Sequence, residues 1–185
     1  DWFIKNPDKQ LVIKIHPAEV VISTNQHFKS LISKRFKKLP ANIRVIEPHE
    51  EVNSWSILSI TDLGLVHTTT VGMELPLEGI PCAVVSSTHF RNKGFTIDVN
   101  NRNEYFDLLK NFSPDKVDRN NLKVLAKRYA YLLFMRYQLP MPFVNPPTHM
   151  GVRSLKIMDI ADIWDDSSIQ IFIDSIENTG DFLAP

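Results

Sequence analysis

The residues best suited to chemistry lie near the middle of the chain, where the polar segment His67–Thr70 follows one apolar run and precedes a stretch with helical spacing. A hydroxyl at Thr69 or Thr70 suits the N-cap of that helix, accepting from a backbone N–H two or three residues further on. Free N–H groups and the positive end of the helix dipole at such a start also attract phosphate. The segment therefore predicts either a phosphate cradle completed by the hydroxyls of Thr68, Thr69 and Thr70 or an ordinary helix cap.

Polar side chains also follow other apolar runs. His16 comes directly after the run 10–15, and Glu47 comes directly after the run 43–46. Glu74 lies about one turn inside the expected helix, where its carboxylate suits the two hydroxyls of a ribose. For an isolated histidine or glutamate, packing at a strand end or solvation on a helix is the commoner role, and that alternative stays open for His16 and Glu74.

Three cationic or potentially cationic residues, His89, Arg91 and Lys93, alternate in the loop 87–94. Such a loop suits an anionic substrate, although a solvated loop explains the same composition. The sequence has no HxxxH pair and none of the glycine-rich phosphate or nucleophile motifs. We therefore expect no metal and no cofactor, and no catalytic residue is assigned.

The order of the apolar runs predicts a parallel sheet. Strands and helices alternate at short spacing up to residue 112, which is typical of βαβ units covered by helices on both faces. Right-handed crossovers place all the strand carboxyl ends at one edge, so the polar residues that follow the strands are expected to converge on one crevice. The expected strands are 10–15, 43–47, 63–67 and 81–85, with a short fifth at 95–99, and the helices 25–39, 52–60, 70–79 and 102–112.

A long apolar helix is predicted over residues 120–139. Its spacing places Leu125, Tyr129, Leu132 and Leu133 on the face towards the core. A proline-rich loop follows at 140–152, and closing helices are expected in the tail. The chain is thus expected to divide into a Rossmann-like α/β domain, residues 1–140, and a crossover with a helical tail, residues 141–185.

Composition limits the class of protein. Among 185 residues, 21 Lys and Arg balance 21 Asp and Glu, which argues against bulk binding of nucleic acid. The single cysteine, Cys82, lies in an apolar run and favours a reduced core residue in a reducing compartment. No run approaches the length of a membrane span. The sequence starts at Asp1, close to a strand, and we expect it to be part of a longer protein.

Several segments, taken in order, resemble a known family. LVIKIHPAE, VHTTTVGMELPLEGIPCAVV, HFRNKGFTIDV and KRYAYLLFMRY are similar to the C-terminal half of capsule and surface polysaccharide biosynthesis proteins. These are glycosyltransferase-like proteins with two Rossmann domains (the GT-B type), related to bacterial Kdo transferases. The resemblance implies that His16 and Thr68–Thr70 contact the donor phosphate, that Glu74 holds ribose, and that the loop beginning at Glu47 lies by the base.

The resemblance also implies partners. They are a nucleotide-sugar donor, a polysaccharide or glycolipid acceptor, and an N-terminal domain that this sequence does not include. It implies a cytoplasmic protein, with peripheral association at the inner face of the membrane. Retaining and inverting chemistry are both open. Two alternatives remain: a nucleotide-sugar epimerase of the same architecture, and a scaffold domain that kept the fold without activity.

Overall fold

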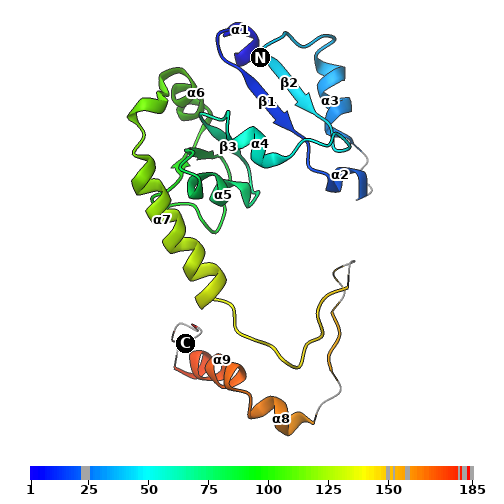
Figure 1. Ribbon diagram of the computed structural model, residues 1–185, viewed down its shortest axis with the longest axis vertical. Coiled ribbons are helices and arrows are strands. Elements are labelled where there is room, and N and C mark those ends of the chain that lie inside the picture. The colour runs from blue at the N-terminus through cyan, green and yellow to red at the C-terminus, as the bar shows by residue number, and fades with distance from the viewer. Residues whose placement is uncertain are drawn as a thin grey trace. The chain divides into compact units, whose positions relative to one another are not determined.

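The computed structural model describes residues 1–21, 26–148, 151, 153–156, 159–178, 180 and 183. The chain divides into two compact units, Asp1–Ile60 and Thr61–Pro185. The division falls at residue 60, inside the range that the sequence predicts to be one domain. Each unit contains its own small parallel sheet (Figure 1).

The first unit is built on two strands. β1 (Leu11–Lys14) and β2 (Ile43–Ile46) pair in parallel with Leu11 opposite Ile43, and in Figure 1 they are the adjacent blue and cyan arrows. The Asn42 side chain donates to the carbonyls of Phe3 and Lys9 at 2.9 and 2.8 Å, which ties the start of β2 to the N-terminal turns. The helices of this unit are α1 (Trp2–Lys5), α2 (Ala18–Val21), α3 (Phe28–Arg35) and α4 (Ser54–Leu58).

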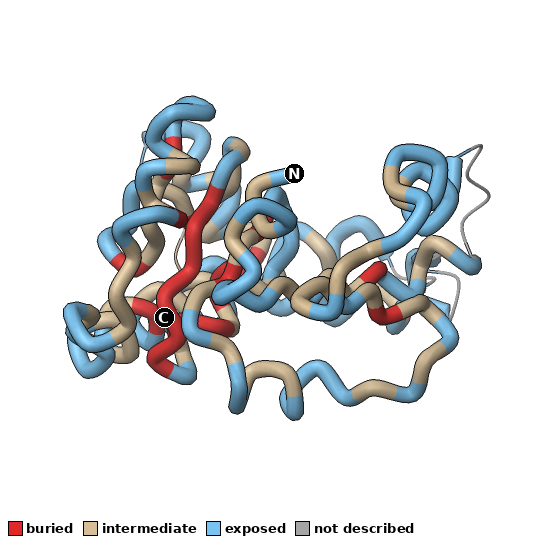
Figure 2. Tube along the Cα trace, turned by 90° about the horizontal axis from the view of Figure 1, so that it is seen from above, coloured by how far each residue is buried: buried red, intermediate tan, exposed pale blue. Residues whose placement is uncertain are grey.

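The second unit holds the larger sheet. β3 (Gly64–Val66), β4 (Cys82–Val84) and β5 (Ile97–Asp98) lie in that order and all pair in parallel. The central strand β4 has no exposed surface, and the buried run extends from residue 79 to 84; buried residues are red in Figure 2. A strand covered on both faces has a continuous apolar sequence rather than an alternating one, and IPCAV has that pattern.

The two crossovers of this sheet differ. α5 (Val71–Leu77) connects β3 to β4, whereas residues 85–96 connect β4 to β5 without a helix. Phe90 and Phe95 in this second connection are fully buried. Phe90 packs against Gly72 so closely that a Cβ at Gly72 would lie 2.8 Å from the Phe90 ring. Two aromatic rings therefore supply the apolar surface that a crossover helix usually provides.

The long helix ends earlier than the sequence predicts. α6 (Arg102–Asn111) and the short η1 (Pro114–Lys116) lead into α7 (Arg119–Tyr131), which packs on α5 and continues as the π-helical turn η2 (Leu132–Arg136). The widened turn is closed by Tyr137 N–H donating to the Leu132 carbonyl at 2.9 Å, and it shifts the phase of the following side chains.

The prediction of which residues of this helix face the core is only partly right. Leu125, Tyr129 and Leu133 are partly buried. Leu132 is 37% exposed, so its predicted place in the core is wrong. It is the first residue of the π-helical turn, where the 3.6-residue spacing no longer holds.

The tail contains α8 (Ile160–Trp164) and α9 (Ser167–Glu177), as the predicted closing helices require. Asp159 and Asp166 cap the two helices by accepting from backbone N–H groups. The predicted proline-rich crossover at 140–152 includes residues 149, 150 and 152, which lie outside the described residues. No helix in the described ranges is long and apolar enough to cross a membrane.

The structure confirms an α/β protein with parallel strands but corrects the single sheet. All four predicted strands are present, and β1–β2 and β3–β4 pair in parallel. Within the described residues they form two sheets rather than one. The helix expected to join the pairs, α4, has five residues and buries none of them, so it does not provide the apolar layer that covers a shared sheet.

A candidate ligand pocket at the carboxyl ends of β3, β4 and β5

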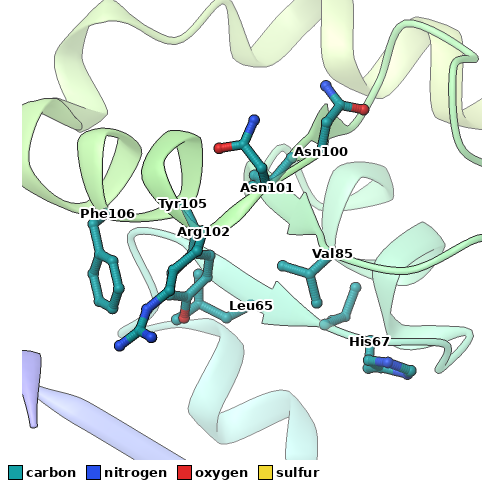
Figure 3. A pocket seen from close by; sticks show the side chains of 10 residues that line it. Leu65, His67, Val85, Asn100, Asn101, Arg102, Tyr105 and Phe106 are labelled. Carbon is teal, nitrogen blue, oxygen red and sulfur yellow. The ribbon is translucent and has the colours of Figure 1, made fainter.

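A hollow of about 510 Å³ lies where the three parallel strands of the second unit end. That volume falls in the ordinary range of small-molecule sites, roughly 300–1,000 Å³. Figure 3 shows side chains from the strand ends facing side chains from the first turns of α6. The lining residues are Leu65, Val66, His67, Val85, Val99, Asn100, Asn101, Arg102, Tyr105 and Phe106.

Aromatic groups form the α6 side of this pocket. The rings of Tyr105 and Phe106 meet edge to face with centroids 5.5 Å apart, and the Arg102 guanidinium lies 5.5 Å from the centre of the Phe106 ring. Partial burial raises the pKa of Tyr105 above its ordinary value. Its hydroxyl therefore stays protonated at neutral pH and is available as a donor.

The start of α6 is fixed by a compact polar network. Asn101 Oδ1 accepts from the backbone N–H groups of Asn103 and Glu104, both at 3.0 Å, and so caps the helix. The Glu104 carboxylate accepts from the Asn100 backbone N–H, the Asn100 side-chain amide and the Asn101 side-chain amide. The bond from the Asn100 N–H is the largest cause that lowers the pKa of Glu104, so the exposed carboxylate stays ionised at neutral pH.

Arg91 braces the strand ends instead of standing free. Its guanidinium donates to the carbonyls of Val84, Ser86 and Val99 at 3.1, 3.2 and 2.9 Å, and to Asn100 Oδ1 at 2.9 Å. It thereby joins the carboxyl ends of β4 and β5 to the network at the start of α6. The sequence predicts Arg91 as a substrate ligand, whereas four of its hydrogen bonds are made within the fold.

The other two basic residues of this loop differ from each other. The hydroxyl of Tyr129 donates to the His89 carbonyl at 2.9 Å and lies 2.7 Å from His89 Nδ1. Because that hydroxyl has one hydrogen, Nδ1 is the donor in the second contact. Lys93 is exposed, and it forms no ion pair within the described part of the chain. Neither residue lines the pocket.

The threonine segment is exposed and borders the pocket through His67. Thr69 Oγ1 accepts from the Val71 N–H at 3.4 Å, while Thr70, at the N-cap position, donates its hydroxyl to Glu74 at 3.1 Å. The Gly72 N–H bonds to the Thr69 carbonyl at 3.1 Å. The first-turn N–H groups at 71 and 72 thus have partners within the turn, so phosphate binding here depends on the hydroxyls, including that of Thr68.

The remaining predicted ligands, His16 and Glu47, belong to the first unit and follow β1 and β2 as expected. His16 Nδ1 accepts from the Ala18 N–H at 3.0 Å, which leaves the proton on Nε2, directed away from that bond. Glu47 forms an ion pair with Lys29 and lies 3.8 Å from His49 Nδ1. Both residues therefore take part in local contacts of this unit.

The α6 side of the pocket was missed by sequence reasoning. Asn100, Asn101 and Arg102 follow β5 just as His67 follows β3, so the rule that polar residues collect at strand ends applied to them too. The capping pattern of Asn101 with Glu104 three residues later was a second signal. Tyr105 and Phe106 lie one turn further along the helix, and no local pattern distinguishes them from core residues.

Comparison with protein-family models, with curated proteins and with solved structures finds no match to this chain. In the described part of the chain, no group of three or more His, Cys, Asp or Glu residues is arranged to hold a metal ion.

Proposed function

We propose that this chain is the donor-binding part of a glycosyltransferase of the two-Rossmann-domain type, acting in the synthesis of a capsule or cell-surface polysaccharide. The donor is a nucleotide sugar. The acceptor is a polysaccharide or glycolipid, bound by a partner domain.

The observation that carries this proposal is the pocket at the carboxyl ends of β3, β4 and β5. In open parallel α/β sheets, ligands bind beyond the carboxyl ends of the strands. The pocket has an apolar base, aromatic side chains on one side and the cation Arg102. These features fit a ligand that combines a planar ring with negative charge.

The polar segment beside the pocket supports the same class of ligand. Thr68 and Thr69 are exposed, and the Glu74 carboxylate lies within hydrogen-bonding distance of Thr70 in the first turn of α5. Hydroxyl donors suit phosphate oxygens, and a carboxylate suits the hydroxyls of ribose. The order of these motifs along the chain is what resembles the polysaccharide glycosyltransferases.

The proposal is tested by ligand binding to the full-length protein. Thermal-shift screening with CMP, CDP, UDP, GDP and their sugars is expected to yield one strong stabiliser, because a ligand that binds only the native state raises its stability by mass action. Calorimetric titration of that ligand then compares Thr69→Ala/Thr70→Ala with Thr148→Ala, an exposed threonine outside the pocket.

The double variant is expected to bind about tenfold to a hundredfold more weakly, the cost of losing a charge-assisted hydrogen bond. Thr148→Ala is expected to bind like the wild type. A protein that no nucleotide or nucleotide sugar stabilises would refute the proposal. If a nucleotide or nucleotide sugar stabilises the protein but the double variant binds it with unchanged affinity, the threonines are not part of the site, and the proposed function still stands.

A further inference from the structure

We propose that the pocket beside α6 binds the base of the nucleotide, and that Arg102 and Tyr105 select a base with an acceptor-rich edge. This inference rests on the proposed function and specifies its ligand. It places the base at the end of the second unit's sheet, whereas the sequence resemblance places it near Glu47 in the first unit.

The first step is that the side-chain acceptors of Asn100, Asn101 and Glu104 already take part in hydrogen bonds within the fold. Asn100 Oδ1 accepts from Arg91, and Asn101 Oδ1 accepts from two backbone N–H groups of α6. Both oxygens of Glu104 accept from the asparagines before it. The side-chain amides of both asparagines each donate one hydrogen to Glu104, and the second hydrogen that each amide keeps is a donor and not an acceptor.

The second step is that the remaining polar groups include two donors. Arg102 has only donors, and within the described residues its guanidinium has a ring contact with Phe106 but no hydrogen bond. The Tyr105 hydroxyl is half-buried and protonated, and no described residue hydrogen-bonds to it. His67, on the opposite side of the pocket in Figure 3, has an exposed ring with no hydrogen-bond partner in the described ranges. The pocket therefore favours a ligand rich in acceptors.

The third step concerns shape and apolar surface. Leu65, Val66, Val85 and Val99 give the pocket an aliphatic base, and the Tyr105 and Phe106 rings line its α6 side. A flat aromatic ring buries its faces against such surfaces, whereas a sugar alone would leave these surfaces in contact with water. His67 lines the pocket, is exposed and directly precedes the threonines, so a phosphate attached to the ligand has hydroxyl donors beyond the ring.

Selectivity follows from the donors. A guanidinium pairs in bidentate fashion with two adjacent acceptors. Guanine offers O6 and N7 on one edge, and cytosine offers O2 and N3. Adenine presents the N6 amino donor beside N7, and that donor would oppose the guanidinium. We therefore expect GMP and CMP to bind more tightly than AMP.

The experiment is calorimetric titration of the full-length protein with GMP, CMP, UMP, AMP and ribose 5-phosphate. Two variants test the pocket: Arg102→Gln removes the cation, and Tyr105→Phe removes the hydroxyl but keeps the ring. Arg128→Gln is the matched control, because Arg128 is an exposed arginine on α7 that does not line the pocket. Thermal melts check that all three variants are folded.

The expected result is that the best nucleotide binds at least about tenfold more tightly than AMP. Arg102→Gln lowers its affinity about tenfold to a hundredfold and Tyr105→Phe about twofold to tenfold, while Arg128→Gln has no effect. Binding of ribose 5-phosphate is weak and insensitive to both pocket variants.

Two results would overturn the inference. If the nucleotides bind but Arg102→Gln and Tyr105→Phe retain wild-type affinity, the base lies elsewhere and only the proposed function survives. If AMP binds as tightly as GMP and CMP, the donor argument is wrong. Conversely, if free nucleotides bind through Arg102 while every nucleotide sugar is excluded, the base site stands and the donor function fails.

Discussion

Replacing Arg91 by lysine separates a structural role from a ligand role for this residue. The guanidinium makes four hydrogen bonds, to the carbonyls of Val84, Ser86 and Val99 and to Asn100 Oδ1. An ammonium group keeps the charge but lacks the planar fork, so it reaches one or two of these acceptors. Val84 O keeps its sheet bond from the Val99 N–H. The variant therefore loses about two hydrogen bonds, and at about 1 kcal/mol each the free energy of unfolding falls by about 2 kcal/mol.

Urea denaturation followed by circular dichroism measures this loss, and hydrogen exchange over residues 97–104 reports whether β5 and the start of α6 loosen together. Lys93→Gln is the control, because Lys93 is an exposed cation of the same loop. We expect it to change the free energy of unfolding by less than about 0.5 kcal/mol. If Arg91→Lys were as stable as Lys93→Gln while nucleotide affinity fell, Arg91 would be a ligand residue and the bracing role would be refuted.

Three further predictions concern the same unit. Gly72→Ala forces a methyl group against the Phe90 ring. Overpacking costs about 1–3 kcal/mol, whereas the better helix propensity of alanine returns up to about 1 kcal/mol. Urea denaturation should therefore show a lower free energy of unfolding, and a higher one would refute the tight contact. The pKa of Glu104 is lowered in the folded protein. The stability that its carboxylate contributes is therefore present above the unfolded-state pKa, near 4.3, and is lost as pH falls through the folded-state pKa. Glu104→Gln should make the free energy of unfolding less dependent on pH in acid, and an unchanged dependence would contradict this. Burial raises the pKa of Cys82 to about 12, so the native protein should not react with a thiol reagent at pH 8 although the urea-unfolded protein does; rapid native labelling would show that β4 is accessible.

Local sequence signals predicted the elements of the fold well. The β-branched runs around Ile13, Val45 and Val84 became strands, because such side chains fit a pleated and buried surface. Gly79, with a φ of 78°, follows the end of α5 as predicted. The division into two sheets could not be predicted in this way, because no local sequence pattern shows whether α4 buries one of its faces against a sheet. The π-helical turn at Leu132 was likewise hidden in a spacing that reads as continuous helix.

Among the described residues, none of those predicted from the sequence as ligands lines the candidate pocket, although their neighbour His67 does. The rule that polar residues collect at strand carboxyl ends indicates the region of the chain but not the role of each residue. It could not show that Arg91 is occupied by the carbonyls of Val84 and Val99, because those contacts depend on the three-dimensional course of the loop. Tyr105 was missed because an aromatic residue on a helix is most often part of a core, and only the fold shows that its hydroxyl faces an open volume.

The helix-free connection between β4 and β5 has a consequence for how this region can change in evolution or by design. Surface loops usually accept insertions and deletions with little effect. In this loop, Phe90 is held against Gly72 and Phe95 lies near Tyr129, with ring centroids 5.3 Å apart. One added or deleted residue between the two rings would pull one of them out of its place. The segment from 90 to 95 therefore has a fixed length, whereas the exposed Lys93 is free to change in residue type.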